Sequence, residues 1–439
     1  MPRRTTVDWL IPVFFWVLAI AAVPFWCDLD PGNGWDAKVY RDAIRSLQAG
    51  HDPYADGIAA QSAFYSQIDI PAHTPPPYAY VYAPLTLPLL RMAGALPESV
   101  YTWGYWLLYG AAALAQLWVT MQAAEPKERR FLVYVAPAAA FFPGLLQDDT
   151  LKCGNVAYIL YGLVFLAALH GWRRDRWRWF YAAALAASAI KAPLLSLLAI
   201  PILSARRQWI PAGAAAAAGV GMFAMQMWLW PTYFRNYLRV VELQFAYNHD
   251  FGISPAGLFS AALSGLGLPY SRAAGLFYIL YALLLAGILF YLARQYFDGK
   301  FSLERWMPVM LAGVILLDPR VMEYDVAPIT LLLALILWRA ASSFTGNARA
   351  VVICCLILAV LNAIVLLARD AGVQSSAWKN TEGCLLVMLF AAGSANLLLD
   401  KRWLRRDGRF GFENTLGRDS SVSAVLLSAS GSAAESSSV

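Results

Sequence analysis

Asp36 is the first candidate for chemistry because it lies at the start of a predicted short helix, directly after the first long apolar run. A carboxylate at a membrane surface is suited to take a proton from a hydroxyl group as a general base. Asp36 could also be the N-cap of that helix, with its side chain accepting from free amides of the first turn. The two roles are compatible. Asp42 lies on the polar face of the same helix and is expected to be only solvated.

Lys191 lies deep within an apolar stretch that covers residues 178–204. Ionisable residues inside such stretches are costly and usually serve function, and an ammonium there could bind a phosphate. The alternative is that the side chain snorkels to the membrane surface, although about a dozen residues, roughly 18 Å of helix, separate it from either end. Because Pro193 disrupts a helix, we expect two short helices with Lys191 at the apex between them, facing a cavity.

A charged loop interrupts two later apolar runs with the sequence DPRVMEYD, residues 318–325. Arg320 carries a planar, fixed set of donors that suits a phosphate. Glu323 and Asp325 could accept from hydroxyl groups of a substrate. The alternative is a loop held together by its own salt bridges.

Three other polar stretches are weaker candidates. Asn155 follows Gly154 and could contact a substrate or cap the next helix. Asp28 and Asp30 could bind a divalent ion through oxygen, but a solvated turn is favoured, so no metal is predicted. Asn248 lies in the polar segment YNHD. The five cysteines show no C-x-x-C spacing, so neither a zinc site nor a disulfide framework is implied.

The composition indicates an all-α membrane protein. Hydrophobic residues make up 59% of the 439 residues and charged residues only 14%, whereas soluble domains carry about a quarter charged residues. The 17 tryptophans also fit a membrane protein. The net charge of +6 could suggest nucleic acid as a partner, but the basic residues form short clusters between apolar runs. Such clusters are typical of cytoplasmic loops, so no nucleic-acid partner is expected.

The apolar runs predict a polytopic protein of about 12 transmembrane helices. Residues 9–26 are expected to be a retained span with a cytoplasmic N-terminus rather than a signal peptide. Residues 83–96 are too short to span, so a half-length or re-entrant segment is predicted there. The longer runs are residues 99–121, 131–146, 155–170, 178–204, 209–230, 273–293, 307–317, 326–341, 349–368 and 381–399.

The basic clusters predict the topology. They lie near residues 127–130, 173–176, 206–207, 294–305, 349 and 401–406, and all of them fall in the cytoplasm if residues 178–204 enter the membrane and return. The polar stretches without basic clusters then share the opposite face. They are residues 27–80, which form the first outer loop, 147–155, the Lys191 apex, 231–272 and 318–325. A shared face is what an active site assembled from loops requires.

The segment around Asp36, GWDAKVYRDAIRSLQAGHDPY, predicts an amphipathic helix that lies on the membrane surface. Its apolar face carries Val39, Ala43, Ile44 and Leu47, and Gly50 ends the helix before a turn at Asp52. This pattern resembles the first outer loop of the family 87 glycosyltransferases. These are membrane enzymes of the GT-C class that take a sugar from a polyprenyl-phosphate carrier.

Other segments extend the resemblance. AIKAPLLSLL resembles the family's I-K-x-P stretch, Gly154-Asn155 resembles a G-Q-x-N turn, and residues 248–257 loosely match N-x-S-x-x-G. The family's P-x-x-W-x-H-H differs here, because Tyr324 and Asp325 stand at the two histidine positions. The resemblance implies that Asp36 is the catalytic base. The expected substrate-binding residues are Tyr40, Asn155, Lys191, Asn248, Arg320, Glu323, Tyr324 and Asp325.

The resemblance also implies the reaction. Residues 1–407 would form a transmembrane glycosyltransferase domain with a GT-C-type arrangement, and residues 408–439 a disordered, cytoplasmic Ser/Ala-rich tail. A mannose-like hexose would pass from a polyprenyl-phosphate sugar to a lipid-linked or glycan acceptor, with inversion and without a cofactor. The site would face the periplasm or exterior of the inner (plasma) membrane. A lipid or sugar transporter or flippase is the alternative, but such proteins usually show repeat symmetry, and this sequence shows none.

Overall fold

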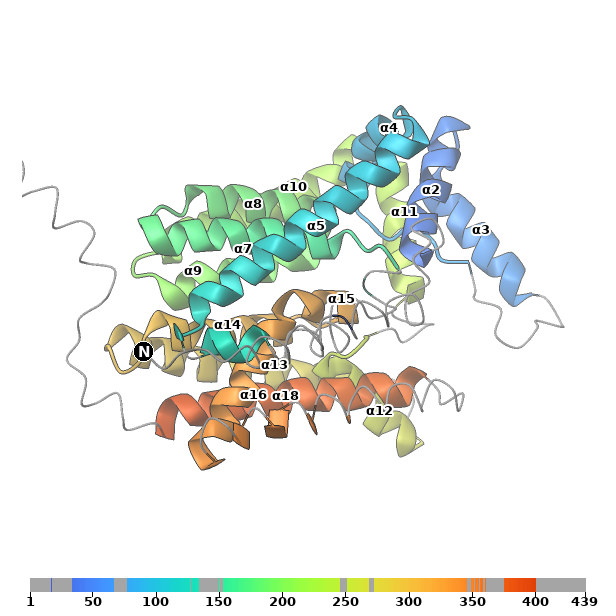
Figure 1. The fold of residues 1–439 in the computed structure, drawn as a ribbon. Coiled ribbons are helices and arrows are strands. Elements are labelled where there is room, and N and C mark those ends of the chain that lie inside the picture. Colours follow the sequence, from blue (N-terminus) through green and yellow to red (C-terminus); the bar gives the residue numbers. More distant parts are fainter. Residues whose placement is uncertain are drawn as a thin grey trace, which may run out of the picture. The chain divides into compact units, whose positions relative to one another are not determined.

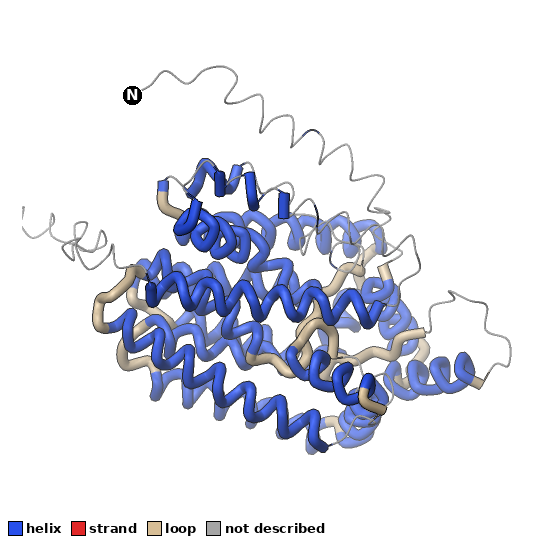
Figure 2. Tube along the Cα trace, turned by 90° about the horizontal axis from the view of Figure 1, so that it is seen from below, coloured by secondary structure: helices blue, strands red, loops and turns tan. Residues whose placement is uncertain are grey.

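The structure, a computed structural model, describes residues 17, 34–66, 77–126, 128–133, 150, 153–244, 251–267, 272–345, 349–350, 352–354, 356–357, 360 and 375–399. These residues form helices and loops, with one isolated bridge between Gly252 and Val321 (Figures 1 and 2). The larger helices in the first half are α2 (Trp35–Gln48), α3 (Pro53–Tyr65), α4 (Leu87–Gly94), α5 (Glu98–Ala123), α7 (Ala157–Arg174), α8 (Arg178–Ile190), α9 (Ala199–Ser204) and α10 (Trp209–Leu229). Those in the second half are α11 (Pro231–Glu242), α12 (Pro255–Gly265), α13 (Arg272–Phe297), α14 (Leu303–Leu316), α15 (Glu323–Val326), α16 (Thr330–Thr345) and α18 (Ser375–Leu399). Short 3-10 helices are η1 (Pro84–Thr86), η3 (Ala192–Leu198) and η5 (Ala327–Ile329).

The amphipathic helix α2 forms as predicted, but its apolar face packs on protein. Val39, Ala43 and Leu47 are buried in one cluster with tyrosines from α3, from residues 80–82 and from α11. Helices α2, α3, α4 and α11 therefore group together (Figure 1). The expectation that this face lies on the membrane surface is wrong, because aromatic side chains of α3, of residues 80–82 and of α11 cover it.

The first outer loop contains a helix that the sequence analysis missed. Asp52 caps α3, and its side chain accepts from the backbone of Tyr54 at 2.9 Å. Residues 83–96 do not span a membrane, because they form only η1 and the eight-residue α4. Helix α4 packs on α2, where Gln48 Nε2 donates to the carbonyl oxygen of Gly94 at 2.9 Å. The prediction that residues 83–96 are too short to span a membrane is thus confirmed.

The stretch 178–204 forms two short helical arms, as predicted. Helix α8 ends at Ile190, Lys191 is extended (φ −128°, ψ 96°), and η3 and α9 lead the chain back. The return is visible in two contacts: Trp172 Nε1 donates to Ser204 Oγ at 2.8 Å, and Tyr181 Oη donates to Gln208 Oε1 at 3.0 Å. We call this unit the α8–α9 hairpin.

Helices α5 and α7 run in parallel. Tyr105, near the start of α5, contacts Gly154, and Gly162 in the middle of α7 packs against Ala112. Near the C-terminus of α7, Arg173 stacks over Trp118 at 5.4 Å from its ring centroid. Both helices therefore end at the same end of the bundle.

Arginines of several described clusters lie at that end, which we call the basic end, whereas the cluster at residues 401–406 lies outside the described residues. Arg206 donates to the carbonyl oxygen of Phe297 at 2.7 Å, and Trp306 donates to that of Leu203 at 2.9 Å. Arg339 forms a bidentate ion pair with Glu128, at 2.7 and 2.8 Å, and donates to the carbonyl oxygen of Ala123. Arg339 also donates to the carbonyl oxygen of Glu304. Together with the bond from Trp172 to Ser204, these contacts join the C-terminal ends of α5, α7, α9, α13 and α16 to the start of α14.

The described residues include four helices that are long and apolar enough to cross a membrane. They are Trp209–Leu229, Ala273–Phe297, Glu323–Thr345 and Thr381–Leu399. Large apolar side chains such as Leu107, Ile210 and Leu283 are exposed, as expected of helices that face lipid. In contrast, every residue of α14 from Trp306 to Leu316 is buried. The full number of spans stays a prediction, because the runs 9–26, 131–146 and 349–368 and the tail lie wholly or largely outside the described residues.

Candidate active site

Four segments converge at the end of the bundle opposite the basic end. They are the first turn of α2, the turn before α7, the apex of the α8–α9 hairpin and the loop between α14 and α15. We call this the site end. Asn155 Nδ2 donates to Asp36 Oδ2 at 2.9 Å, and Lys191 Nζ lies 2.6 Å from Asp325 Oδ1. The positive charges of Lys191 and Arg320 are close enough to Asp36 to lower its pKa, although burial has the larger, opposite effect.

Asp36 is the second residue of α2 and is partly exposed. The alternative that it is the N-cap is wrong, because Gly34 occupies that position. Its carboxylate instead accepts from the side chains of Asn155 and Cys153. Burial raises the pKa of Asp36 above the ordinary 3.8, while these hydrogen bonds and the cations oppose that rise. A partly exposed carboxylate with a raised pKa is a suitable general base.

Asn155 bonds both to the start of α7 and to Asp36, whereas a contact with substrate stays a prediction. Its Oδ1 accepts from the backbone of Ala157 at the start of α7 at 2.9 Å, and its Nδ2 reaches Asp36. The residue is only 2% exposed. Gly154 before it has φ +67°, and a Cβ there would lie 3.4 Å from that of Ala37. A left-handed glycine lets the turn approach α2 this closely.

Lys191 is paired rather than facing a cavity. Its side chain is 11% exposed and that of Asp325 2%. The ammonium also lies 4.6 Å from the centre of the Tyr324 ring. The other oxygen of Asp325 accepts from the backbone of Met322 at 3.0 Å. The alternative of a charged loop held by salt bridges is thus confirmed in part. Asp325 of the loop does form a salt bridge, but its partner is Lys191 from another segment.

Arg320 is the second cation of the site end and, like Lys191, is partly exposed. Its side chain donates to Tyr324 Oη at 3.2 Å, and its backbone donates to Asp318 Oδ1 at 3.0 Å. Asp318 is buried, and burial and the nearby charge of Asp325 raise its pKa to about 7. Glu323 is also buried, at 1% exposure. A role for Glu323 in holding substrate hydroxyl groups stays a prediction.

Tyr40 links α2 to the start of α7. Its hydroxyl group hydrogen-bonds Tyr82 Oη at 2.7 Å and accepts from the backbone of Val156 at 3.2 Å. Tyr40 is only 5% exposed and connects the two helices through these hydrogen bonds. Its expected contact with a substrate stays a prediction.

The segment 251–254, which the sequence analysis matched only loosely, anchors the charged loop. Ile253 donates its backbone N–H to Val321 O at 2.7 Å, and Ser254 Oγ donates to Pro319 O at 2.7 Å. Ser254 also caps α12 by accepting from Gly257. Ser254 followed by Pro255 is a signal for that cap, whereas the contact with the loop has no local signal. Asn248 lies outside the described residues.

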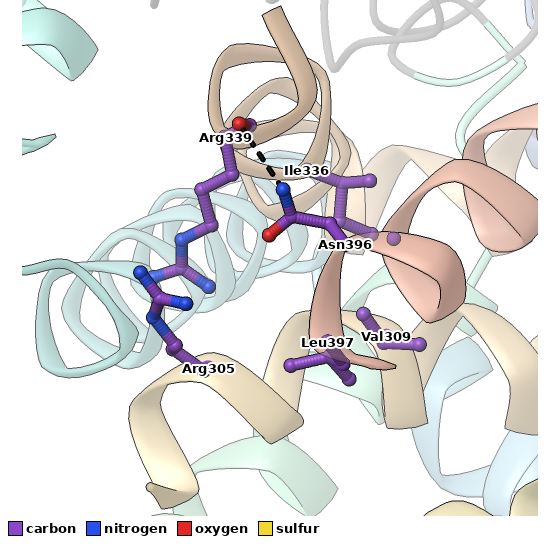
Figure 3. Close-up of a pocket in the computed structure, with 7 residues that line it drawn as sticks. Arg305, Val309, Ile336, Arg339, Asn396 and Leu397 are labelled. Carbon is purple, nitrogen blue, oxygen red and sulfur yellow. Dashed lines mark hydrogen bonds between the residues drawn. The ribbon is translucent and has the colours of Figure 1, made fainter. Parts of the chain in front are cut away.

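A small pocket lies at the basic end, away from Asp36 (Figure 3). It is lined by Arg305, Val309, Ile336, Arg339, Gly393, Asn396 and Leu397. Arg339 is neutralised by Glu128, and Arg305 lies 3.8 Å from Glu125. The charges here hold helices together. In the part of the chain that the structure describes, no three His, Cys, Asp or Glu residues are placed to hold a metal, and Asp28 and Asp30 lie outside it.

The helices and the site end define a membrane protein with a charged, partly exposed site. A family model for glycosyltransferase family 87 matches residues 74–319, more than half of the chain. The chain therefore belongs to glycosyltransferase family 87 and is a membrane glycosyltransferase. The match includes Asn155 and Lys191 and ends at Pro319, so Asp36 and Arg320 lie outside it. Neither curated proteins nor solved structures gave a match.

Proposed function

We propose that this membrane glycosyltransferase moves a mannose-like hexose from a polyprenyl-phosphate sugar to a lipid-linked or glycan acceptor. Asp36 is the general base, and the anomeric centre is inverted. The observation that carries the proposal is the Asp36 carboxylate, held by Asn155 and under the influence of Lys191 and Arg320. Transfer of a sugar from a phosphate leaving group needs a base for the acceptor hydroxyl group and positive charge near the leaving phosphate.

The proposed reaction is one displacement. Asp36 takes the proton of the acceptor hydroxyl group while the oxygen of that group attacks the anomeric carbon. The bond from that carbon to the phosphate oxygen breaks, and the phosphate leaves with the electron pair. Arg320 offers a fork of donors to the leaving phosphate. Lys191 and Arg320, whose positive charges both act on Asp36, would together stabilise the charge of the leaving phosphate.

The two ends of the bundle support an assignment of the side of the membrane on which the reaction takes place. Basic clusters mark the cytoplasmic side of a membrane protein, and among the described residues Arg173 and Arg206 of two such clusters lie at the end opposite Asp36. We therefore place the site on the non-cytoplasmic face, which is the periplasm or exterior of the inner (plasma) membrane. The family favours a transferase over the transporter or flippase alternative.

The proposal is tested with Asp36→Asn and radiolabelled polyprenyl-phosphate sugars. Asn keeps the shape and an oxygen that accepts from Asn155, but it removes the proton acceptor. Turnover should fall by roughly a hundredfold or more, with unchanged thermal unfolding. Asp36→Ala should lose turnover similarly and also stability, about 1–3 kcal/mol, because the buried amide of Asn155 loses its acceptor.

Asp42→Asn is the matched control, since Asp42 is exposed on the same helix and its variant should retain turnover. If Asp36→Asn transfers sugar at the normal rate, Asp36 is not the base. If the wild-type protein uses only nucleotide sugars, the proposed donor is wrong.

A further inference from the structure

We propose that Asn155 is a positioning residue for Asp36 rather than a ligand of the substrate. It fixes the orientation of the carboxylate through a rigid turn before α7. This inference rests on the proposed function, because it gives Asn155 a role only if Asp36 is the base.

The orientation of the Asn155 amide is determined by its neighbours. The backbone N–H of Ala157 is a donor, so only the amide oxygen can accept from it. The NH₂ group must then face Asp36, where it donates to Oδ2. A flipped amide would lose the bond to Ala157 and place an oxygen against a carboxylate. One side chain thus connects the start of α7 to the first turn of α2.

The backbone around Asn155 is held from two other helices. Tyr109 of α5 donates its hydroxyl group to the carbonyl oxygen of Asn155. The carbonyl oxygen of Cys153 accepts from Ala37 in α2 at 3.1 Å. The next residue, Val156, donates to Tyr40 of α2. Such supporting contacts hold a catalytic group within a narrow range of positions.

Burial separates positioning from substrate binding. Asn155 is 2% exposed, and both ends of its amide are engaged by protein. It therefore offers little surface to a sugar. Asp36, in contrast, is partly exposed and can meet an acceptor.

The bond also has an electrostatic effect. A donor to the ionised carboxylate favours the charged form and so lowers the pKa of Asp36, against the effect of burial. Loss of this donor should raise that pKa. Activity limited by ionised Asp36 would then be lost at a higher pH on the acid side.

The test uses Asn155→Asp, which keeps an oxygen for the Ala157 N–H but replaces the donor by a second carboxylate. We expect the acid limb of kcat to move to higher pH, and at a pH on that limb kcat should fall about tenfold for each unit of the move. The KM values for donor and acceptor should change by less than about twofold, and turnover should recover at alkaline pH. Asn155→Ala should shift the limb in the same direction, and Asp42→Asn should not shift it.

A raised KM with an unmoved acid limb would show that Asn155 binds substrate, and would overturn the inference. A second readout avoids activity altogether: the infrared carbonyl band of protonated Asp36, assigned by its absence in Asp36→Asn, should persist to higher pH in Asn155→Ala. If that band moves but Asp36→Asn is fully active, the proposed function fails while Asn155 still positions Asp36. If the band does not move, the inference fails alone.

Discussion

At the scale of the residue, two charged side chains of the site end each have a specific hydrogen-bonding partner. Asp36 has Asn155, and Lys191 has Asp325. A buried charge that loses its partner is strongly destabilising, so these contacts maintain the site as well as serve it. The sequence predicted which residue types gather here, because a lysine in an apolar run and a charged loop are unusual. It could not predict the pairing, since Lys191 and Asp325 lie far apart in the chain and no local pattern joins them.

Asp318 supplies a residue-scale prediction about pH. Its pKa in the folded protein is about 7, raised from 3.8 mainly by burial. Between these values the unfolded chain releases a proton that the folded protein keeps. The free energy of unfolding should therefore fall as pH rises from about 4 to about 7, and then level off. Asp318→Asn should remove this contribution, and thermal unfolding in detergent from pH 4 to 8 measures it.

The quantity to compare is the difference in the free energy of unfolding between wild type and Asp318→Asn at each pH. The raised pKa of Asp36 also makes stability fall as pH rises, but it does so in both proteins and therefore cancels. Asn can still accept from the backbone of Arg320, so that contact is matched. A variant whose stability follows the wild-type pH dependence throughout would show that Asp318 is ionised in the folded protein at acid pH.

At the scale of the element, helices with continuous apolar runs were predictable. Helices α5, α10 and α13 start and end within a few residues of the expected runs. Helix α3 was missed because residues 53–65 have no apolar stripe, although Asp52-Pro53 is a helix start signal. The partner of the apolar face of α2 was not predictable either, because two of its three segments, residues 80–82 and α11, are distant in sequence.

Gly252 gives a prediction at this scale. Its φ is +61°, and a Cβ would lie 2.0 Å from the carbonyl oxygen of Val321. Gly252→Ala must therefore displace the loop that carries Arg320 and Asp325. We expect a stability loss of at least about 1–2 kcal/mol from the left-handed backbone alone, a lower thermal midpoint and weaker donor binding.

Gly275→Ala is the matched control. Gly275 lies in α13 with open space around the Cβ position, and alanine is favoured over glycine in a helix. That variant should be as stable as wild type or slightly more so. If Gly252→Ala also binds donor normally, segment 251–254 does not position the charged loop.

At the scale of the whole molecule, the basic end and the site end predict the topology. Asp42, near the site, and Arg174, at the basic end, are both exposed. On a cysteine-free background, an impermeant maleimide added outside intact cells should label Asp42→Cys and not Arg174→Cys. Both should react after permeabilisation. Labelling of both, or of Arg174→Cys alone, in intact cells would contradict the proposed orientation.

The Lys191–Asp325 pair also has a consequence for how the protein is made. The two residues are 134 positions apart, so the lysine is synthesised well before its partner. A lone ammonium among apolar residues is costly, so in that interval water or lipid headgroups must hold it near the membrane surface. The α8–α9 hairpin can reach its final depth only after α14 and the loop that follows it have been inserted. The α8–α9 hairpin thus takes its final position only after the second half of the chain has been inserted. In a chain truncated before Asp325, Lys191 would lack its partner and the hairpin would not reach that position.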